Sequence, residues 1–106
     1  MLQQFFSIAF IRIHILYHAS QGPIFGLAII EELGRHGYRI SPGTLYPLLH
    51  RMEKEGFMRS KRVKSDGRIR RMYRITSKGL HALEEAKRKV RELFREIIDA
   101  EPCKGK

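Results

Sequence analysis

The apolar positions at the start of the chain predict a helix over residues 4–19. Ile11 lies among the polar positions of this helix, which are Gln4, Ser7, His14 and His18. Apolar side chains cover most of the remaining circumference, an arc wider than the stripe that a surface helix of a small domain buries. Such a helix needs cover on two sides, and a second copy of the chain could supply one of them.

Two shorter helices are predicted next. Pro23 suits the first position of a helix that runs to about His36, and Gly37 suits its termination. Its apolar face holds Gly26, Ile29, Ile30 and Leu33. An extended link is predicted over residues 38–40. Ser41 is then a candidate N-cap with Pro42 at the first helical position, and the third helix runs to Glu55.

The third helix separates its residues into an inner and an outer face. Leu45, Leu48, Leu49 and Met52 form the inner stripe. The outer positions are Gly43, Tyr46, Pro47, His50, Arg51 and Lys54. Because Pro47 removes a backbone donor, the regular helix either starts later, near Gly43, or bends slightly at this point.

Residues 57–65 and 68–75 alternate as strands do, and Asp66-Gly67 between them predicts a type I′ hairpin. Tyr73 and Ile75 face one way, whereas Arg70, Met72 and Arg74 face the other. A last helix is predicted from Ser77 to Ala100, with Thr76 as its N-cap. Its apolar residues recur at alternating spacings of three and four, as in a coiled-coil seam: Leu83, Ala86, Val90, Leu93, Ile97 and Ala100, widened by Phe94 and Ile98.

Positive charge is concentrated in one segment. The formal net charge is +10 and the isoelectric point about 10.3. Within residues 59–74 a single acidic residue, Asp66, stands against Arg59, Lys61, Arg62, Lys64, Arg68, Arg70, Arg71 and Arg74. A basic segment beside a nearly neutral remainder favours a polyanionic partner, nucleic acid first and an anionic membrane surface second.

Several classes of protein are disfavoured. The 106 residues suit one core, and the single cysteine excludes a disulfide framework and a cysteine-based zinc site. The longest apolar stretch, Phe5–Tyr17, is too short to span a membrane and is a poor signal peptide, so we expect a cytoplasmic protein. No phosphate-binding loop, dinucleotide fingerprint, HExxH or nucleophile elbow is present, and we expect neither catalysis nor a cofactor.

The predicted order is three helices, a basic hairpin and a long helix, which indicates a mainly α winged helix-turn-helix with a β-hairpin wing. The third helix would enter a major groove, where Thr44, His50 and Arg51 have donors for base edges. Residues of the wing that flank its turn would contact phosphates: Lys61, Lys64, Arg68 and Arg70.

Three motifs resemble the PadR family of transcriptional regulators. The longest is Ser41-Pro42-Gly43-Thr44-Leu45-Tyr46-Pro47-Leu48-Leu49, followed by Arg51-Met52-Glu53 and Glu55-Gly56. Arg71-Met72-Tyr73-Arg74-Ile75-Thr76 with Gly79 resembles the end of the family's wing, with Met72 where Tyr is usual. Pro23-Ile24-Phe25-Gly26-Leu27 is a partial match in the second helix. The resemblance covers roughly residues 5–100.

The resemblance implies a winged-helix homodimer on a palindromic DNA operator, usually a repressor released by a small molecule, here an aromatic or cationic effector between subunits. It adds Ser41, Gly43, Tyr46 and Pro47 to the DNA-binding residues. It also implies that the first and last helices form the dimer interface, which agrees with the wide apolar arc and the seam. The interface residues expected are Phe6, Phe10, Ile13, Leu83, Val90, Leu93, Phe94 and Ile97.

These predictions divide the chain into a winged-helix domain (1–76), a C-terminal dimerisation helix (77–101) and a flexible tail (102–106). Two other functions stay open: a low-specificity architectural DNA-binding protein, and a winged helix used for protein interaction. His14 and His18 have the i, i+4 spacing of metal ligands, but without an evident third ligand we interpret them as ordinary polar-face histidines and expect no metal site.

Overall fold

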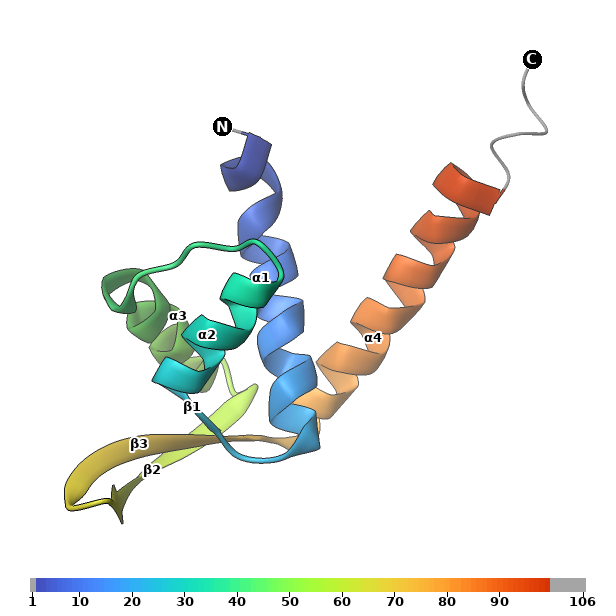
Figure 1. Cartoon of the computed structure of the whole chain (residues 1–106). Coiled ribbons are helices and arrows are strands. Elements are labelled where there is room, and N and C mark those ends of the chain that lie inside the picture. The colour runs from blue at the N-terminus through green and yellow to red at the C-terminus, as the bar shows by residue number, and fades with distance from the viewer. Residues whose placement is uncertain (1, 100–106) are drawn as a thin grey trace.

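The computed structural model describes the backbone of residues 2–99 and the side chains of residues 8–99. Three helices precede a β-hairpin, and a long helix follows it (Figure 1). The elements in chain order are α1 (Leu2–Gln21), β1 (Ile24–Phe25), α2 (Gly26–Arg35), α3 (Pro42–Lys54), β2 (Met58–Ser65), β3 (Arg68–Ile75), α4 (Ser77–Phe94) and a π-helical turn η1 (Arg95–Asp99). This order confirms the predicted winged helix-turn-helix fold. The expected tail (102–106) lies outside the described residues.

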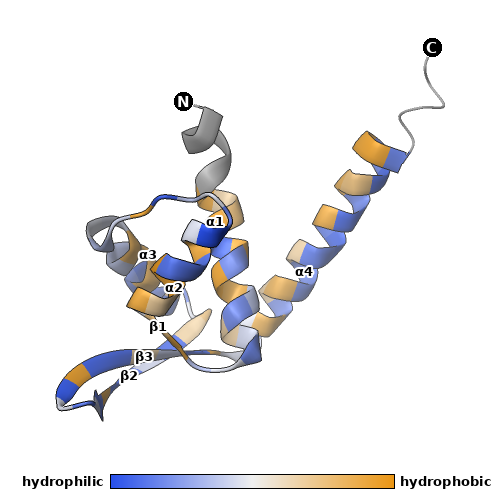
Figure 2. Cartoon of the chain, in the orientation of Figure 1, coloured by the Kyte–Doolittle hydropathy of each residue, from blue (hydrophilic) through white to orange (hydrophobic). Residues whose placement is uncertain are grey.

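Helix α1 runs through the middle of the domain and extends two residues beyond its predicted range at each end. Its core-facing residues are Ile11, Ile15, Leu16 and Ala19, all at most 6% exposed. The placement of Ile11 among the polar positions was therefore wrong. The core packs one side of α1, while Ile8, Phe10 and Tyr17 are 40–51% exposed, so the apolar arc is indeed wider than one core can cover (Figure 2).

The segment after Gly22 differs from the prediction. Pro23 does not begin a helix; Ile24 and Phe25 instead form the short strand β1, and α2 begins at Gly26. Ile24 pairs with Tyr73 and Phe25 with Met72, so β1 adds a third antiparallel strand at the β3 edge of the hairpin. The segment is extended because it pairs with β3, which lies nearly fifty residues away in sequence. This pairing overrides the local preference of proline for the start of a helix.

Helix α3 begins where Ser41 and Pro42 predicted, with Ser41 at the N-cap in an extended conformation. The alternative start near Gly43 is wrong, and Pro47 is accommodated inside the helix. The Ser41 hydroxyl does not cap a backbone N–H but lies 3.4 Å from the Thr44 hydroxyl. All four predicted inner residues, Leu45, Leu48, Leu49 and Met52, are buried.

The hairpin matches its prediction closely. Asp66 and Gly67 both have positive φ, 53° and 74°, as a type I′ turn requires. The register pairs Ser65 with Arg68 next to the turn and Met58 with Ile75 at the base. Met58 and Tyr73 anchor the base in the core, whereas the outer half carries the basic side chains.

Helix α4 leaves the domain after two anchored turns. Its predicted N-cap is confirmed: Thr76 Oγ1 accepts a hydrogen bond from Gly79 N at 3.1 Å and donates one to the Gly56 carbonyl at 2.6 Å. Gly79 and Leu83 are buried, but the helix beyond Leu83 projects from the domain (Figure 1). Among the described residues, no helix is both long and apolar enough to cross a membrane.

Candidate nucleic-acid interface

The outer face of α3 is accessible, and of its residues Tyr46 is held against another element, as described below. Leu45, Leu48, Leu49 and Met52 fix the helix to the core from beneath. The seven residues of α3 and its cap that the sequence assigned to DNA are all exposed: Ser41, Gly43, Thr44, Tyr46, Pro47, His50 and Arg51. The structure therefore places them together on one accessible helix face, the geometry that a recognition helix needs in a major groove.

Tyr46 is held against the first residue of α2. A β-carbon added at Gly26 would lie 2.4 Å from the Tyr46 hydroxyl and 2.5 Å from its ring carbons. Only glycine leaves room for the ring at this point, so α2 and α3 meet through this pair. The ring remains 38% exposed and faces Arg68, Ile69, Arg70 and Arg71 of β3 across a shallow depression.

A polar network connects α3 to the wing. Both carboxylate oxygens of Glu53 accept from the Ser60 hydroxyl at 2.9 Å, and Oε2 also accepts from the Ser60 backbone N–H at 3.1 Å. Arg71 Nη1 donates to the same hydroxyl at 3.0 Å. Burial raises the pKa of the nearby Tyr73 phenol, and the Glu53 carboxylate raises it further, so Tyr73 stays neutral in the core. The network fixes the angle between the two elements that would contact DNA.

The wing carries cations on both of its faces. Pairing across the hairpin puts Lys61 on the same face as Arg68 and Arg70, whereas Lys64 lies on the opposite face with Arg62 and Arg71. Lys61, Lys64 and Arg68 are exposed. Arg70 is partly buried because its guanidinium stacks on the Phe25 ring, 4.8 Å from the centroid. The four predicted phosphate contacts thus surround the wing tip rather than share one face.

A second accessible feature is an apolar groove of about 910 Å³ between α1 and α4. Of the predicted interface residues, Phe10, Val90, Leu93, Phe94 and Ile97 are 40–51% exposed and Ile13 is half-buried. Leu83 also lines the groove, but it is only 3% exposed because it packs into the chain's own core, so it offers little surface to a partner. Phe6 lies outside the residues whose side chains are described.

One grouping in the groove was missed by the sequence analysis. His36, the C-cap residue of α2, stacks on His14, with ring centroids 4.6 Å apart and ring planes inclined by 27°. His14, His18 and His36 each present a ring nitrogen within 4.8 Å of the others. The i, i+4 spacing of the first two was visible in the sequence, but the third comes from another element and has no local signal.

The comparisons with known proteins agree with this architecture. Residues 15–85 match the model of the transcriptional regulator PadR-like family. The chain is 50% identical over 93 residues to the transcriptional regulator Rv3488 of Mycobacterium tuberculosis, covering 88% of this chain and 87% of that relative.

Solved structures give the same result. A PadR-like transcriptional regulator from Bacillus cereus is 36% identical, with a TM-score of 0.76 over 83% of this chain and 87% of the other. A PadR family regulator from Eggerthella lenta is 30% identical, with a TM-score of 0.72 over 81% and 76%. Together with the exposed face of α3 and the basic wing described above, these matches show that the chain belongs to the PadR-like family of transcriptional regulators.

Proposed function

We propose that this chain is a sequence-specific regulator that binds a palindromic DNA operator as a homodimer. The exposed outer face of α3, tied by Glu53 and Ser60 to a basic wing, carries this proposal. A major groove admits a helix of this kind, where Arg51 and His50 can reach base edges. The wing cations then lie where they can neutralise the phosphate backbone, which adds affinity without reading sequence.

The groove between α1 and α4 supports the dimer. A half-exposed apolar row on the projecting part of α4 and on η1 consists of Val90, Leu93, Phe94, Ile97 and Ile98. Ile8, Phe10 and Tyr17 present another row on α1. A soluble monomer rarely leaves so much contiguous apolar surface in water. A two-fold axis along these helices would cover both rows and place two copies of α3 on successive turns of the DNA.

We also propose that the protein represses transcription and that a small aromatic or cationic molecule in the groove releases it. The groove is lined mainly by apolar side chains, with aromatic rings from Phe10, Tyr17 and Phe94. Concave sites of this volume and character suit small-molecule ligands. A panel of aromatic cations and phenolic acids should raise the melting temperature and release operator DNA; flat results in both assays would contradict the effector.

Two substitutions test the DNA surface directly. Arg51→Ala should lower affinity for the operator by about 1–3 kcal/mol and leave affinity for a scrambled duplex nearly unchanged, because a bidentate contact to guanine discriminates between bases. Arg68→Ala should weaken both duplexes equally and reduce the salt dependence of log K by about one unit. The measurement is a fluorescence anisotropy titration of each variant at several salt concentrations.

Lys89→Ala, which removes a cation from the polar face of α4, is the matched control and should change neither titration. If Arg68→Ala removes operator preference while Arg51→Ala removes only general affinity, then the wing reads sequence and α3 supplies general affinity, the reverse of our proposal. Equal affinity of the wild type for all duplexes would favour an architectural DNA-binding protein. Absence of DNA binding at low salt would favour a protein-interaction module.

A further inference from the structure

The wall of the groove holds a cluster of histidines that DNA binding does not use. Three of the five histidines in the chain, His14, His18 and His36, converge there from two different elements. His14 and His18 lie one helical turn apart on α1, and His36 closes the C-terminal end of α2. Convergence of three imidazoles from separate elements is a property of the tertiary fold.

Their spacing is close to what a metal ion requires. The three ring nitrogens lie within 4.8 Å of one another. Even at the widest spacing, the centre of such a triangle is about 2.8 Å from each nitrogen, against about 2.0–2.1 Å for a zinc–imidazole bond. Each nitrogen needs to move inward by less than 1 Å, which small side-chain rotations supply. His14, His18 and Glu32 are partly buried and the groove is open, so an ion and a water ligand can enter.

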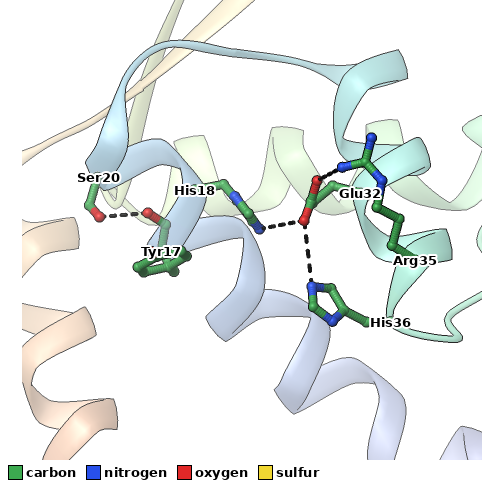
Figure 3. Close-up of polar contacts among 6 residues, drawn as sticks. All are labelled: Tyr17, His18, Ser20, Glu32, Arg35 and His36. Carbon is green, nitrogen blue, oxygen red and sulfur yellow. Dashed lines mark hydrogen bonds and ion pairs between the residues drawn. The ribbon is translucent and has the colours of Figure 1, made fainter.

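A carboxylate stands beside two of the three rings. Glu32 Oε2 lies 3.5 Å from His36 Nε2 and 3.7 Å from His18 Nε2, while Oε1 is held by Arg35 Nη1 at 2.5 Å (Figure 3). A carboxylate next to metal-bound imidazoles orients them and increases their basicity. The contact with Arg35 holds the Glu32 carboxylate in an orientation that directs Oε2 toward His18 and His36.

The charges around the cluster are compatible with a cation bound by neutral imidazoles. Burial, followed by the neighbouring His36 and His18, lowers the pKa of His14 below its usual value. Lys87 and Arg91 line the groove from α4, but Lys87 is paired with Glu84 at 3.1 Å. Glu32 is the carboxylate nearest to the imidazoles and offsets part of a divalent charge.

We propose that His14, His18 and His36 bind one divalent transition-metal ion per chain in the groove wall, with Glu32 as the carboxylate that orients His18 and His36. Three imidazoles favour zinc, cobalt, nickel or copper over calcium and magnesium, which prefer oxygen. A three-ligand set leaves a coordination position for water, so the ion is exchangeable rather than a permanent structural element.

The location gives the ion a regulatory role, and this part rests on the proposed operator binding. A bound ion would clamp α1, which lines the proposed dimer groove, to the end of α2. At the other end of α2, Gly26 packs against the Tyr46 ring of α3. Occupancy of the site therefore biases the placement of the recognition helix within the dimer, and operator affinity should differ by about fivefold or more between the loaded and metal-free protein.

The direct test is a Co²⁺ titration of the full chain without a histidine tag, followed by visible spectroscopy and calorimetry. We expect one ion per chain with the absorption of cobalt in a nitrogen-rich site. His14→Ala and His36→Gln should each abolish that spectrum, and Glu32→Gln should weaken binding about 10–100-fold. His81→Ala is the matched control, since His81 is exposed on α4 outside the cluster. Cys103→Ser removes the only thiol of the chain and should leave the titration unchanged.

Absence of Co²⁺ and Zn²⁺ binding by a wild type with a normal melting transition would overturn the site. Unchanged binding in His14→Ala and His36→Gln would also overturn it, as would a titration abolished by Cys103→Ser. Operator titrations with metal-free and Zn²⁺-loaded protein then test the regulatory role. Equal operator affinities would overturn that role alone, and failure to bind any operator would contradict the proposed function while the cobalt result still decides the site.

Discussion

Two helical glycines differ in the space that surrounds them, one being tightly packed and the other open. A β-carbon at Gly79 would lie 2.2 Å from the Phe57 carbonyl oxygen and 2.6 Å from Ile75 Cγ1. The Phe57 carbonyl cannot move away freely, because it accepts a hydrogen bond from Thr76 N at 3.1 Å. At Gly34, near the end of α2, nothing lies within 4 Å of such an atom.

Gly79→Ala should therefore destabilise the protein by about 1–3 kcal/mol or more, since the backbone at the start of α4 must shift to accept the methyl group. Gly34→Ala should stabilise it by about 0.5–1 kcal/mol, because alanine restricts the unfolded chain and leaves the native state unstrained. Urea denaturation of both variants checks the pair. A stable Gly79→Ala variant would show that α4 is not held against the hairpin base as the structure has it.

At the residue scale, the sequence predicted positions whose role depends on near neighbours. The N-cap positions Ser41 and Thr76 and the Asp66-Gly67 turn were assigned correctly because these signals depend on about four neighbouring residues, although the Ser41 hydroxyl caps no backbone N–H. The surroundings of Leu83 and His36 could not be predicted in this way, since they depend on how distant elements pack. Leu83 continued the seam pattern yet fills the core, and His36 meets His14 only in the folded chain.

At the scale of elements, the contact between α3 and the wing is polar and specific. The Glu53 carboxylate accepts a hydrogen bond from the Ser60 backbone N–H and a bifurcated one from the Ser60 hydroxyl, and Arg71 of β3 donates to the same hydroxyl. Glu53 lies on the side of α3 that faces the hairpin, so we expect it to contact neither bases nor phosphates. We therefore expect Glu53 to affect DNA binding only through the angle between α3 and the wing.

Glu53→Gln should weaken binding to operator and scrambled duplex alike, even though it removes a negative charge from a DNA-binding protein. It should also cost about 1–3 kcal/mol of stability, the usual value for hydrogen bonds to a charged group. Glu31→Gln removes the same charge from an exposed position of α2 and should leave DNA affinity equal or slightly higher. Anisotropy titrations of both decide the matter; tighter binding by Glu53→Gln would contradict a positioning role.

Prediction of whole elements succeeded where a strong local pattern coincides with the tertiary arrangement. The buried stripe of α3 and the hairpin are specified by periodicity and turn residues together. Strand β1 was missed because two residues carry no periodicity and their partners, Tyr73 and Met72, lie far along the chain. The apolar arc of α1 correctly indicated surplus exposed surface, although Ile11 belongs to its buried side.

At the scale of the whole molecule, the structure has two chemically different surfaces. The strands of the wing are largely hydrophilic (Figure 2). The groove between α1 and α4 is lined mainly by apolar side chains. Two-fold association through the groove would leave both DNA-contacting elements of each subunit exposed. The distance between the recognition helices is then set by the dimer and not by either subunit alone.

Leu93→Asp should convert the dimer to a monomer or an aggregate, because it places a carboxylate in the middle of the half-exposed apolar row of α4. Lys89→Asp introduces the same carboxylate on the polar face of the helix and should remain dimeric. Light scattering at micromolar concentration distinguishes them. A wild-type mass near 12.4 kDa would contradict the dimer from the outset.

The measurement that tests the central claim most directly is selection of bound sequences from a library of random DNA duplexes with the wild-type protein. A homodimer reading DNA through α3 predicts an enriched two-fold symmetric motif whose half-sites are centred about 10–10.5 base pairs apart, or a multiple of that spacing. The same motif should not be enriched by Arg51→Ala. Recovery of unselected sequence at every salt concentration that permits binding would contradict a sequence-specific regulator.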